Sequence, residues 1–502
     1  MVRVRFAPSP TGPLHMGGVR TALYNYLFAK KNNGSFIIRI EDTDQKRYVP
    51  GAEEYIQEAL AWSGFEADES PAKPGKYGPY RQSERKALYK TYTQQLIDSG
   101  QAYYAFDTAE ELDEMRDKAK AAKMPNWQYN SVTRNQMRNS LTLSEDETKE
   151  SIANGDPFVI RLKVPRNEEV RFHDEIRGWV VVNSSNIDDK VLYKSDGMPT
   201  YHLANIVDDH LMEITHVIRG EEWLPSAPLH ILLYKAFGWE APKFAHLPLI
   251  LRPDGNGKLS KRDGDRLGFP VFPLNWTDPT TKEQSSGYRE RGYFPEAFVN
   301  MLSFLGWNPG TSQELFSMEE LIEAFSLERV GKAGAKFDAE KTKWFNQQYL
   351  RMQNNEALAQ LVFEKAQAKD TSISLETLSQ ICGLMKERAY FPDDLIADGD
   401  YFFSAPTSFD EKTVKKKWKE ETPSIMLDIK TRFDETDFSA EALETAFKAY
   451  LEEKEIGFGK VGPGLRLCIT GLGMGPSLFH ICSILGKDET LQRIDAALEQ
   501  LS

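Results

Sequence analysis

Residues 6–18 read FAPSPTGPLHMGG, a stretch of proline, glycine and one histidine that follows the strand-like start MVRVR. In residues 2–6, apolar side chains alternate with arginine, which is the period of a β-strand. After the loop, apolar residues recur at the spacing of one helix face, at Val19, Ala22, Leu23, Tyr26 and Leu27. Asn33-Gly34 is the expected end of this helix. FIIRI (36–40) then predicts a buried strand that ends in EDTD (41–44). This order predicts a βαβ unit that binds a nucleotide beyond the carboxyl ends of its strands.

The loop has the glycines of a phosphate-binding loop but not its cation. The dinucleotide fingerprint GxGxxG is absent, and Gly18 stands where the P-loop spacing of Gly12 and Gly17 would require lysine. His15 can donate one hydrogen bond to a phosphate. If the ligand is a triphosphate, its lysine must come from another part of the chain.

A second glycine-rich segment, DGNGKLSKRDGD (254–265), offers three cations, Lys258, Lys261 and Arg262. A flexible loop of this kind could close over a triphosphate and follow negative charge as it develops. An exposed basic turn would explain these residues if they stood alone. The phosphate loop that lacks a lysine favours the functional interpretation.

Composition limits the class of protein. A chain of 502 residues predicts two to four domains, and a net charge of −13 argues against indiscriminate nucleic-acid coating. Cys382, Cys468 and Cys482 form neither a disulfide framework nor a CxxC zinc site. No signal peptide and no apolar run of about 18 residues is evident, so we expect a cytoplasmic protein without membrane contact. The basic run KTVKKKWKEE (412–421) fits a solvated helix face or phosphate contacts.

Two signatures and four longer strings resemble a known family. PLHMGG is similar to the HIGH motif, and KLSKR to the KMSKS motif, of class I aminoacyl-tRNA synthetases. RFAPSPTGPLHMGGVRTALYNYLFA, IRIEDTD, PTYHLANIVDDH and VIRGEEWLPSAPLH resemble bacterial glutamyl-tRNA synthetases, in family order. The resemblance covers residues 1–350 most strongly and continues weakly to GLRLCITGLGMGP. It implies ATP-dependent ligation of L-glutamate to tRNA(Glu), through glutamyl-adenylate and then transfer to the 2′-hydroxyl of the terminal adenosine.

The amino-acid pocket can be read from the residues beside this resemblance. Glutamate brings two carboxylates and one ammonium group; Arg5 can hold a carboxylate bidentately, and Arg219 offers a second guanidinium. Glu41 can pair with the ammonium group, and neutral side chains can add hydrogen bonds. The resemblance assigns to glutamate binding Arg5, Ser9, Glu41, Tyr201, Asn205 and Arg219.

The resemblance also implies an ATP site with Mg²⁺ bridging the phosphates. It assigns to ATP binding His15, Gly17, Gly18, Glu222, Lys258, Leu259, Ser260 and Lys261, and to catalysis His15, Lys258, Lys261 and Arg262. No general base is required, because the attacking carboxylate of glutamate is already ionised. Catalysis is then positioning and stabilisation of charge on oxygen.

Two segments bear on protein-bound metal. By resemblance, family members with zinc carry cysteines in the region that reads QAYYAFDT (101–108) here. Tyr104 and Phe106 stand there, so we predict no zinc, with apolar or aromatic contacts packing this corner instead. HLANIVDDH (202–210) has the composition of a metal cluster, but a helix whose polar groups hydrogen-bond locally is the favoured interpretation. We therefore predict no metal site formed by the protein alone.

The predicted fold is an α/β Rossmann-like class I catalytic domain with an inserted α/β acceptor-binding domain, followed by α-helical stem-contact and anticodon-binding domains. The expected ranges are 1–80 with 196–254 for the catalytic domain, 81–195 for the insertion, 255–340 for the stem-contact segment and 341–502 for the anticodon-binding region. The insertion contains the strand-like FVIRLKV and GWVVVN.

Two rival interpretations share this scaffold. A glutaminyl-tRNA synthetase would show different signatures around HMGG and SKR, and a paralogue without activity would show damaged ones, whereas His15, Lys258 and Lys261 are intact. Charging of tRNA(Gln) as a second substrate stays open. The family suggests a monomer.

Overall fold

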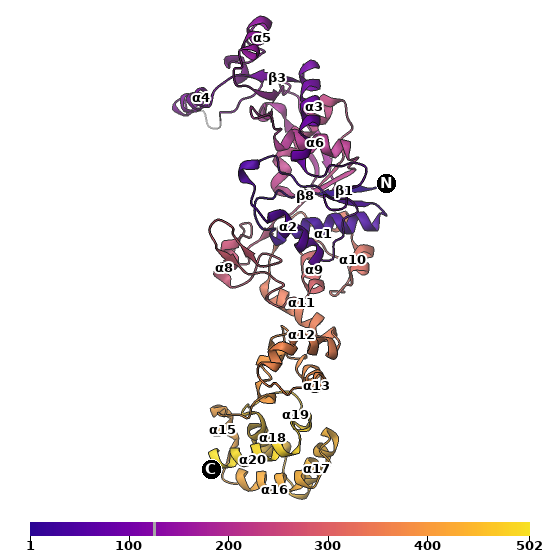
Figure 1. The fold of residues 1–502 in the computed structure, drawn as a ribbon, viewed down its shortest axis with the longest axis vertical. Coiled ribbons are helices and arrows are strands. Elements are labelled where there is room, and N and C mark those ends of the chain that lie inside the picture. The colour runs from indigo at the N-terminus through magenta and orange to yellow at the C-terminus, as the bar shows by residue number, and fades with distance from the viewer. Residues whose placement is uncertain (124–126, 502) are drawn as a thin grey trace. The chain divides into compact units, whose positions relative to one another are not determined.

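The computed structural model describes residues 1–123 and 127–501. The chain forms two compact units, Met1–Arg291 with Phe298–Ala339 and Gly292–Ala297 with Glu340–Ser502; the first is mixed α/β and the second is helical (Figure 1). Within the described ranges, no helix has the length and apolar character needed to cross a membrane.

The predicted βαβ unit is confirmed. Strand β1 (Arg3–Phe6) pairs in parallel with β2 (Ser35–Ile38), and α1 (Met16–Lys31) connects them and packs against both. The alternation of β1 does not separate a buried face from an exposed one, because every residue of the strand is buried. Its two arginines are buried in ion pairs with Glu69 and Asp209.

A larger sheet continues beside β1. Its strands follow the order β6-β5-β9-β8 and are β5 (Glu169–Asp174), β6 (Gly178–Asn183), β8 (His216–Gly220) and β9 (Lys243–Leu247). Strand β8 lies next to β1, where the Thr215 amide donates to the Arg3 carbonyl at 2.9 Å. From this pair, β2 extends to one side and β9 to the other. Such a switch point leaves a crevice beyond the carboxyl ends of the two middle strands.

Helices cover both sides of these central strands. Helix α1 packs against β1, β2 and β8, and Figure 1 shows α6 (Tyr201–Leu211) on the other side. Helix α7 (Ala227–Phe237) packs against α6 and β5. The core between them is apolar and includes Val207, Leu233 and Phe244. Helix α2 (Ala52–Trp62) packs on α1.

The stretch predicted as an insertion contributes to two sheets. FVIRLKV contains β4 (Val159–Leu162), which lies between β3 (Ala102–Ala105) and β7 (Val191–Tyr193). GWVVVN contains β6, whose hairpin partner β5 joins β9 at Asp174 and Phe244, so this hairpin extends the larger sheet. Helices complete the stretch: α3 (Lys86–Asp98), α4 (Ala109–Ala121) and α5 (Glu145–Ala153).

Aromatic side chains pack the corner where zinc-binding relatives carry cysteines. The Phe158 ring meets that of Tyr104 at 5.1 Å and that of Phe106 at 6.1 Å between centroids, both edge-on. Arg138 lies over Phe106 at 5.6 Å. The predicted aromatic packing is confirmed.

Short elements lie on both sides of the KLSKR segment. They are β10 (Ile250–Leu251), α8 (Lys261–Leu267), β11 (Trp276–Thr277), β12 (Gln284–Ser285), α9 (Pro295–Ser303), α10 (Met318–Ala324) and β13 (Ala335–Lys336). Strands β11 and β12 form an antiparallel hairpin, and β10 pairs in parallel with β13. Helix α9 contains Phe298, Met301 and Leu302 and ends at Ser303, before Leu305.

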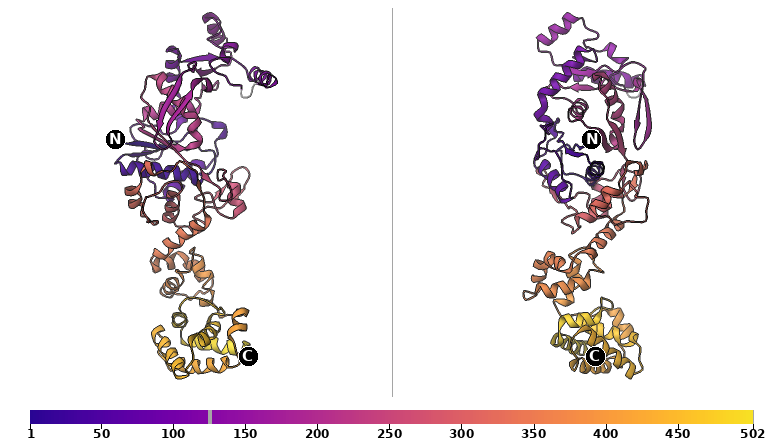
Figure 2. Two further views of the ribbon diagram at one scale, coloured as in Figure 1. Left: turned by 180° about the vertical axis from the view of Figure 1, so that it is seen from behind. Right: turned by 90° about the vertical axis from the view of Figure 1, so that its right-hand side faces the viewer.

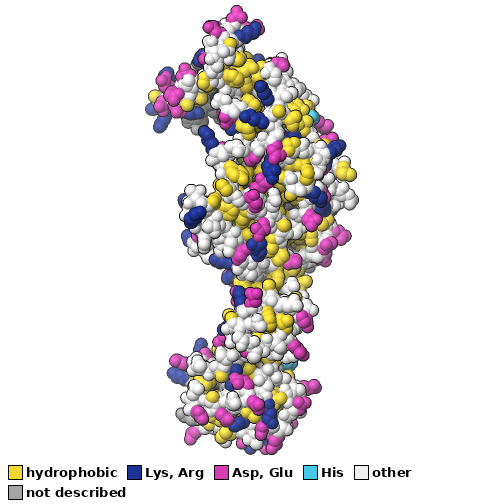
Figure 3. Space-filling view, in the orientation of Figure 1, with side chains coloured by type: hydrophobic (Ala, Val, Ile, Leu, Met, Phe, Trp, Pro, Cys, Tyr) yellow, Lys and Arg dark blue, Asp and Glu magenta, His cyan; other side chains and the backbone are white. Residues whose placement is uncertain are grey.

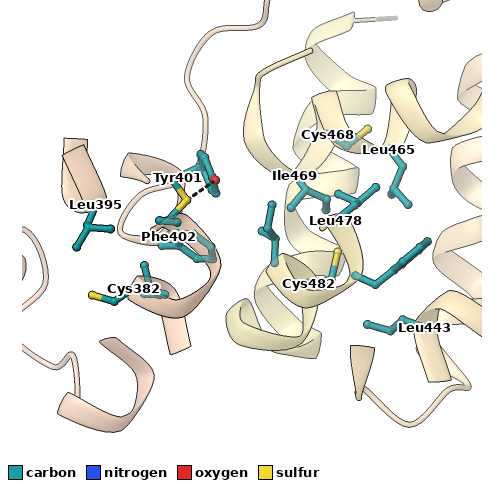
Figure 4. Packing of buried hydrophobic residues seen from close by; sticks show 14 of the residues in the cluster. Cys382, Leu395, Tyr401, Phe402, Leu443, Leu465, Cys468, Ile469, Leu478 and Cys482 are labelled. Carbon is teal, nitrogen blue, oxygen red and sulfur yellow. Dashed lines mark hydrogen bonds between the residues drawn. The ribbon is translucent and has the colours of Figure 1, made fainter. Parts of the chain in front are cut away.

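The second unit consists of helices joined by loops in every view (Figures 1 and 2). These are α11 (Ala339–Met352), α12 (Asn355–Gln367), α13 (Leu375–Met385), α14 (Asp394–Ala397), α15 (Glu411–Lys417), α16 (Thr422–Asp434), α17 (Ala440–Glu453), α18 (Phe458–Thr470), α19 (Leu478–Leu485) and α20 (Lys487–Leu501). All three cysteines are free and buried in their core, where Cys482 lies among apolar side chains such as Ile469 and Leu478 (Figure 4).

Candidate functional site

A cavity of about 630 Å³ lies at the switch point, beyond the carboxyl ends of β1 and β8. All six residues predicted to bind glutamate line it: Arg5, Ser9, Glu41, Tyr201, Asn205 and Arg219. Most of the predicted ATP set lines it as well: His15, Gly17, Gly18, Glu222, Lys258 and Leu259. The remaining predicted residues do not line it: Ser260, Lys261 and Arg262.

The glycine loop presents a neutral hydrogen-bond donor to this cavity. His15 caps α1, and its Nδ1 accepts from the Gly17 amide at 3.1 Å, so the ring proton sits on Nε2. Nε2 is buried and has no partner within the described part of the chain. Burial, together with the charge of Lys258, lowers the pKa of His15 to about 4. The imidazole is therefore neutral at pH 7 and offers one unused N–H.

Arg5 is held before any ligand arrives. Its Nε and one Nη donate to Asp209 at 3.0 and 3.1 Å, and Asp209 also accepts from Arg39 at 2.8 Å. The second Nη of Arg5 makes no hydrogen bond to a described residue. Arg5 is only 3 % exposed, so its direction is fixed by this buried pairing.

The aspartates of HLANIVDDH have distant partners. Asp208 accepts from Arg85 at 2.7 Å, from Gln82 at 2.9 Å and from Tyr89 at 2.8 Å. The expectation that these polar groups bond locally was wrong, because a buried carboxylate needs charged or polar partners and the cations that pair with these aspartates lie on other elements. No group of metal-ligating residues forms here or elsewhere in residues 1–123 and 127–501.

Glu41 brings negative charge to the same cavity. Its Oε1 accepts from Arg39 and from the Asn205 amide, both at 3.0 Å. Burial raises the pKa of Glu41, and the guanidinium groups of Arg39 and Arg5 act against that rise. The bond to Glu41 also fixes the amide of Asn205, so its carbonyl oxygen stays unused within the described residues.

Arg219 is a buried cation that no carboxylate neutralises among the described residues. It is 5 % exposed, and its strongest partners are neutral, His246 at 3.0 Å and the Tyr201 hydroxyl at 2.8 Å. Tyr201 in turn packs on Trp223 at 4.5 Å between ring centroids. A buried charge without a counter-ion is costly, so this wall favours a bound anion.

Each lysine of the KLSKR segment forms an ion pair with a glutamate. Lys258 pairs with Glu222 at 2.8 Å at the cavity, whereas Lys261, the first residue of α8, pairs with Glu283 at 2.5 Å. Ser260 caps α8, and Arg262 is exposed. The structure therefore does not bring Lys261 to the other predicted phosphate contacts.

In the second unit, the basic run lies at α15 and the loop after it. Lys417 and Lys419 donate to the carbonyls of Gly459 and Lys415, both at 3.0 Å. On the face shown in Figure 3, acidic and basic side chains are interspersed.

Sequence reasoning missed the residues behind the cavity wall. Asp209 and Arg39 fix Arg5 and Glu41, and His246 fixes Arg219. The paired aspartates in HLANIVDDH were a visible signal for one of them. No local pattern marks Arg39 or His246.

Comparison with known proteins identifies similar chains. Residues 1–344 match a family described as tRNA synthetases class I (E and Q), catalytic domain, and residues 347–498 match one described as an anticodon binding domain. A glutamate–tRNA ligase of Flavobacterium johnsoniae is 59 % identical to this chain, and the match covers all of this chain and 99 % of the relative. One of Cytophaga hutchinsonii is 57 % identical, and the match covers all of this chain and 98 % of the relative. A crystal structure of a glutamate tRNA ligase from Elizabethkingia meningosepticum, in complex with its amino acid, has a TM-score of 0.95 at 55 % identity, with both chains fully covered.

Proposed function

Because this chain belongs to the glutamate–tRNA ligase family of class I aminoacyl-tRNA synthetases, we propose that it ligates L-glutamate to tRNA(Glu) with ATP for protein synthesis. Glutamyl-adenylate forms first, and the glutamyl group then passes to the 2′-hydroxyl of the terminal adenosine. The signature residues that a paralogue without activity would lose, His15, Lys258 and Lys261, are intact. His15 and Lys258 line one cavity, which supports the proposal.

The charge pattern of the cavity wall carries this proposal. Arg219 is buried without a counter-ion, Arg5 retains an unused Nη, and Glu41 supplies a carboxylate. Two cations and one anion match the two carboxylates and the ammonium group of glutamate. Ser9, Tyr201 and Asn205 add neutral hydrogen-bonding groups at the same cavity.

We assign the phosphates of ATP to the glycine loop. The unused Nε2–H of His15 can donate to a phosphate oxygen, and the glycines at 17 and 18 allow close approach of the backbone. Lys258 adds a cation at the same cavity. Lys261 joins the site only after it leaves Glu283.

Mg²⁺ fits this arrangement as a partner of ATP. The described residues offer no cluster of three or more ligating side chains, so the phosphate oxygens, which Mg²⁺ prefers, would supply most of its ligands. When bound, the ion neutralises charge on the phosphates. The assignments of His15 and Lys258 do not depend on it.

The first chemical step needs orientation more than proton transfer. The substrate carboxylate is ionised at neutral pH and attacks the α-phosphorus, which releases pyrophosphate. Arg219, Arg5 and Glu41 hold the amino acid, and His15 and the lysines stabilise the oxygens that gain charge. Binding removes translational and rotational freedom from the two reactants before they react, and this is itself a large contribution to the rate.

Recognition of tRNA is assigned to the remaining parts of the chain. We propose that residues 81–195 contact the acceptor arm, that 255–340 contact the stem and that 341–502 bind the anticodon, with KKKWK touching phosphates. The anticodon-binding family match over residues 347–498 supports the last assignment. We propose a cytoplasmic monomer.

Pyrophosphate exchange with ATP tests the activity. With glutamate and tRNA(Glu) we expect exchange, and by family resemblance we expect none without tRNA. Glutamine in place of glutamate should give no exchange. Glutamine-dependent exchange would establish the glutaminyl rival, and absence of exchange with either amino acid would establish a non-enzymatic paralogue. Aminoacylation of tRNA(Gln), measured in parallel, shows whether it is a second substrate.

A further inference from the structure

The buried cation of the cavity wall is itself held by a histidine. Arg219 on β8 and His246 on β9 are directly paired across the two parallel strands, and the arginine Nε donates to the histidine Nε2 at 3.0 Å. His246 is fully buried. A bond from Nε fixes the plane of a guanidinium group and so directs both of its Nη atoms.

Asp174 decides which way this histidine faces. Its carboxylate lies 2.6 Å from Nδ1 of His246 and also accepts the backbone amides of Ile176 and Arg177, at 3.0 and 2.8 Å. Burial raises the pKa of Asp174, but the bonds from His246 and these amides outweigh it and hold the pKa below its usual value. An ionised Asp174 takes the Nδ1 proton, so Nε2 keeps its lone pair for Arg219.

The neutral partner matters for recognition. An acid in place of His246 would form an ion pair with Arg219 and compete with the substrate carboxylate. Burial lowers the pKa of His246, so it is uncharged at neutral pH. The other bonds of Arg219 also go to neutral groups, the Tyr201 hydroxyl at 2.8 Å, a His230 nitrogen at 3.4 Å and the Trp223 carbonyl at 3.4 Å.

We propose that Asp174 and His246 are positioning residues for glutamate: they aim the Arg219 guanidinium into the cavity while leaving its charge free for a substrate carboxylate. Neither residue lines the cavity. Both act through Arg219. This inference rests on the proposed function and adds a specificity device to it.

The variant Asp174→Asn tests the proton direction. Its amide oxygen must stay on the Ile176 and Arg177 amides, so its NH₂ group faces His246, and the ring then turns an N–H toward Arg219. We expect the KM for glutamate to rise roughly 10- to 100-fold, the effect of losing a hydrogen bond to a charged group. We expect kcat, the KM for ATP and Tm to change little. Unchanged KM for glutamate would overturn the proposal.

A second pair of variants decides the matter even if Asp174→Asn fails to fold. His246→Gln keeps an acceptor for Arg219, whereas His246→Ala removes it. The KM for glutamate should therefore rise less in His246→Gln than in His246→Ala. The matched control His216→Gln changes a histidine that starts the same strand β8 and does not line the cavity. It should leave the KM for glutamate unchanged.

Two further outcomes separate this inference from its premise. Equal losses for His246→Ala and His246→Gln, in the KM values for glutamate and ATP alike and with a lowered Tm, would mean a merely structural role. A wild-type protein without glutamate-dependent activity would refute the proposed function. An active wild type with unaffected variants would refute this inference alone.

Discussion

Arg5 holds one carboxylate, that of Asp209, and we propose that it binds a second one, that of the substrate. Asp209 takes its Nε and one Nη, which fixes the side chain and leaves the other Nη for a ligand. Arg39 shares Asp209 and also reaches Glu41, so the cation and the anion of the pocket are held by one buried network. Removing Arg39 would leave Glu41 without its paired cation, which is strongly destabilising, whereas removing Arg5 leaves Asp209 paired with Arg39.

The variant Arg5→Ala tests the substrate assignment. Glutamine would point NH₂ hydrogens at the donors of the arginine, and a site built for a polar partner can reject such an analogue by roughly 10⁴. We expect Arg5→Ala to abolish glutamate use and to reduce the preference for glutamate over glutamine, while ATP binding stays near normal. Steady-state aminoacylation with each amino acid measures this. A retained preference would make Arg5 a purely structural partner of Asp209.

His15 should act as a neutral donor. We expect His15→Ala to lower kcat by about 10²-fold, the scale of losing one donor to developing charge, and His15→Gln to lose less. The folded pKa of about 4 lies below the unfolded value near 6.5, so the wild-type imidazole gains a proton only as pH falls toward 4. The ratio of wild-type to His15→Gln kcat should therefore be constant from pH 6 to 8. An inflection near pH 6.5 would contradict a neutral His15.

At this scale the sequence reveals groups that belong to a local motif. His15, Lys258 and the six glutamate contacts stand in short strings with their own chemistry, and all of them line the cavity. The groups that hold these side chains in place do not stand in such strings. Asp209 lies 204 residues from Arg5, and His246 lies 27 residues from Arg219 on another strand. Helix α6 brings Asp209 to Arg5, and the pairing of β8 with β9 brings His246 to Arg219.

Among the elements, the proposed role of Lys261 requires the loop that leads into α8 to change its contacts during the reaction. Lys261 is paired with Glu283, close to the β11–β12 hairpin, and both side chains are partly exposed. An exposed pair of this kind contributes at most about 1 kcal/mol, so a triphosphate can compete for the lysine. The glycine-rich composition of residues 254–265 explains why this loop was expected to move.

We expect Lys261→Ala to lower the rate of glutamate activation by about 10²- to 10³-fold with little change in glutamate affinity. Glu283→Gln is the control, because it removes the present partner of Lys261 and keeps the lysine; it should not lower the activation rate. Single-turnover formation of glutamyl-adenylate in the presence of tRNA measures both variants. A Lys261→Ala protein with nearly wild-type turnover would refute the phosphate assignment.

The aromatic corner at β3 should take the structural place of a metal knuckle. Phe106 is 2 % exposed and packs on Phe158, so Phe106→Ala should lower the free energy of unfolding by about 3–5 kcal/mol. Denaturant unfolding measures the loss, with the exposed Leu141→Ala as control. We also expect elemental analysis to find no stoichiometric zinc after dialysis against a chelator. One retained zinc per chain would contradict this prediction.

The elements also show where periodicity stops being informative. GWVVVN and FVIRLKV have the same strand signal, yet β6 belongs to the larger sheet and β4 to the smaller one. Which sheet a strand joins depends on pairing across long sequence separations, such as Asp174 with Phe244. The order strand, glycine loop, helix, strand was predictable because its contacts are local and its crossover has one favoured hand.

At the scale of the whole molecule, the two units differ in how they bury reactive groups. The first unit places titratable side chains around a cavity, whereas the second encloses Cys382, Cys468 and Cys482 in an apolar core (Figure 4). Burial raises the pKa of each thiol to about 12. Since the thiolate is the reactive form, none of the three should react while the core is intact.

Thiol titration with Ellman's reagent tests that core. At pH 8 the native protein should expose no reactive thiol over minutes, and three should react in concentrated guanidinium chloride. The folded pKa of about 12 lies above the unfolded value of about 8.5, so the free energy of unfolding falls as pH rises from 8.5 toward 12, because only the unfolded chain then ionises these thiols. Adding ATP, which we assign to the first unit, should not change the number. Cys382, Cys468 and Cys482 are fully buried, so we expect the helical core to stay closed. A thiol that reacts at once in the native protein would contradict this expectation and show that the core opens readily.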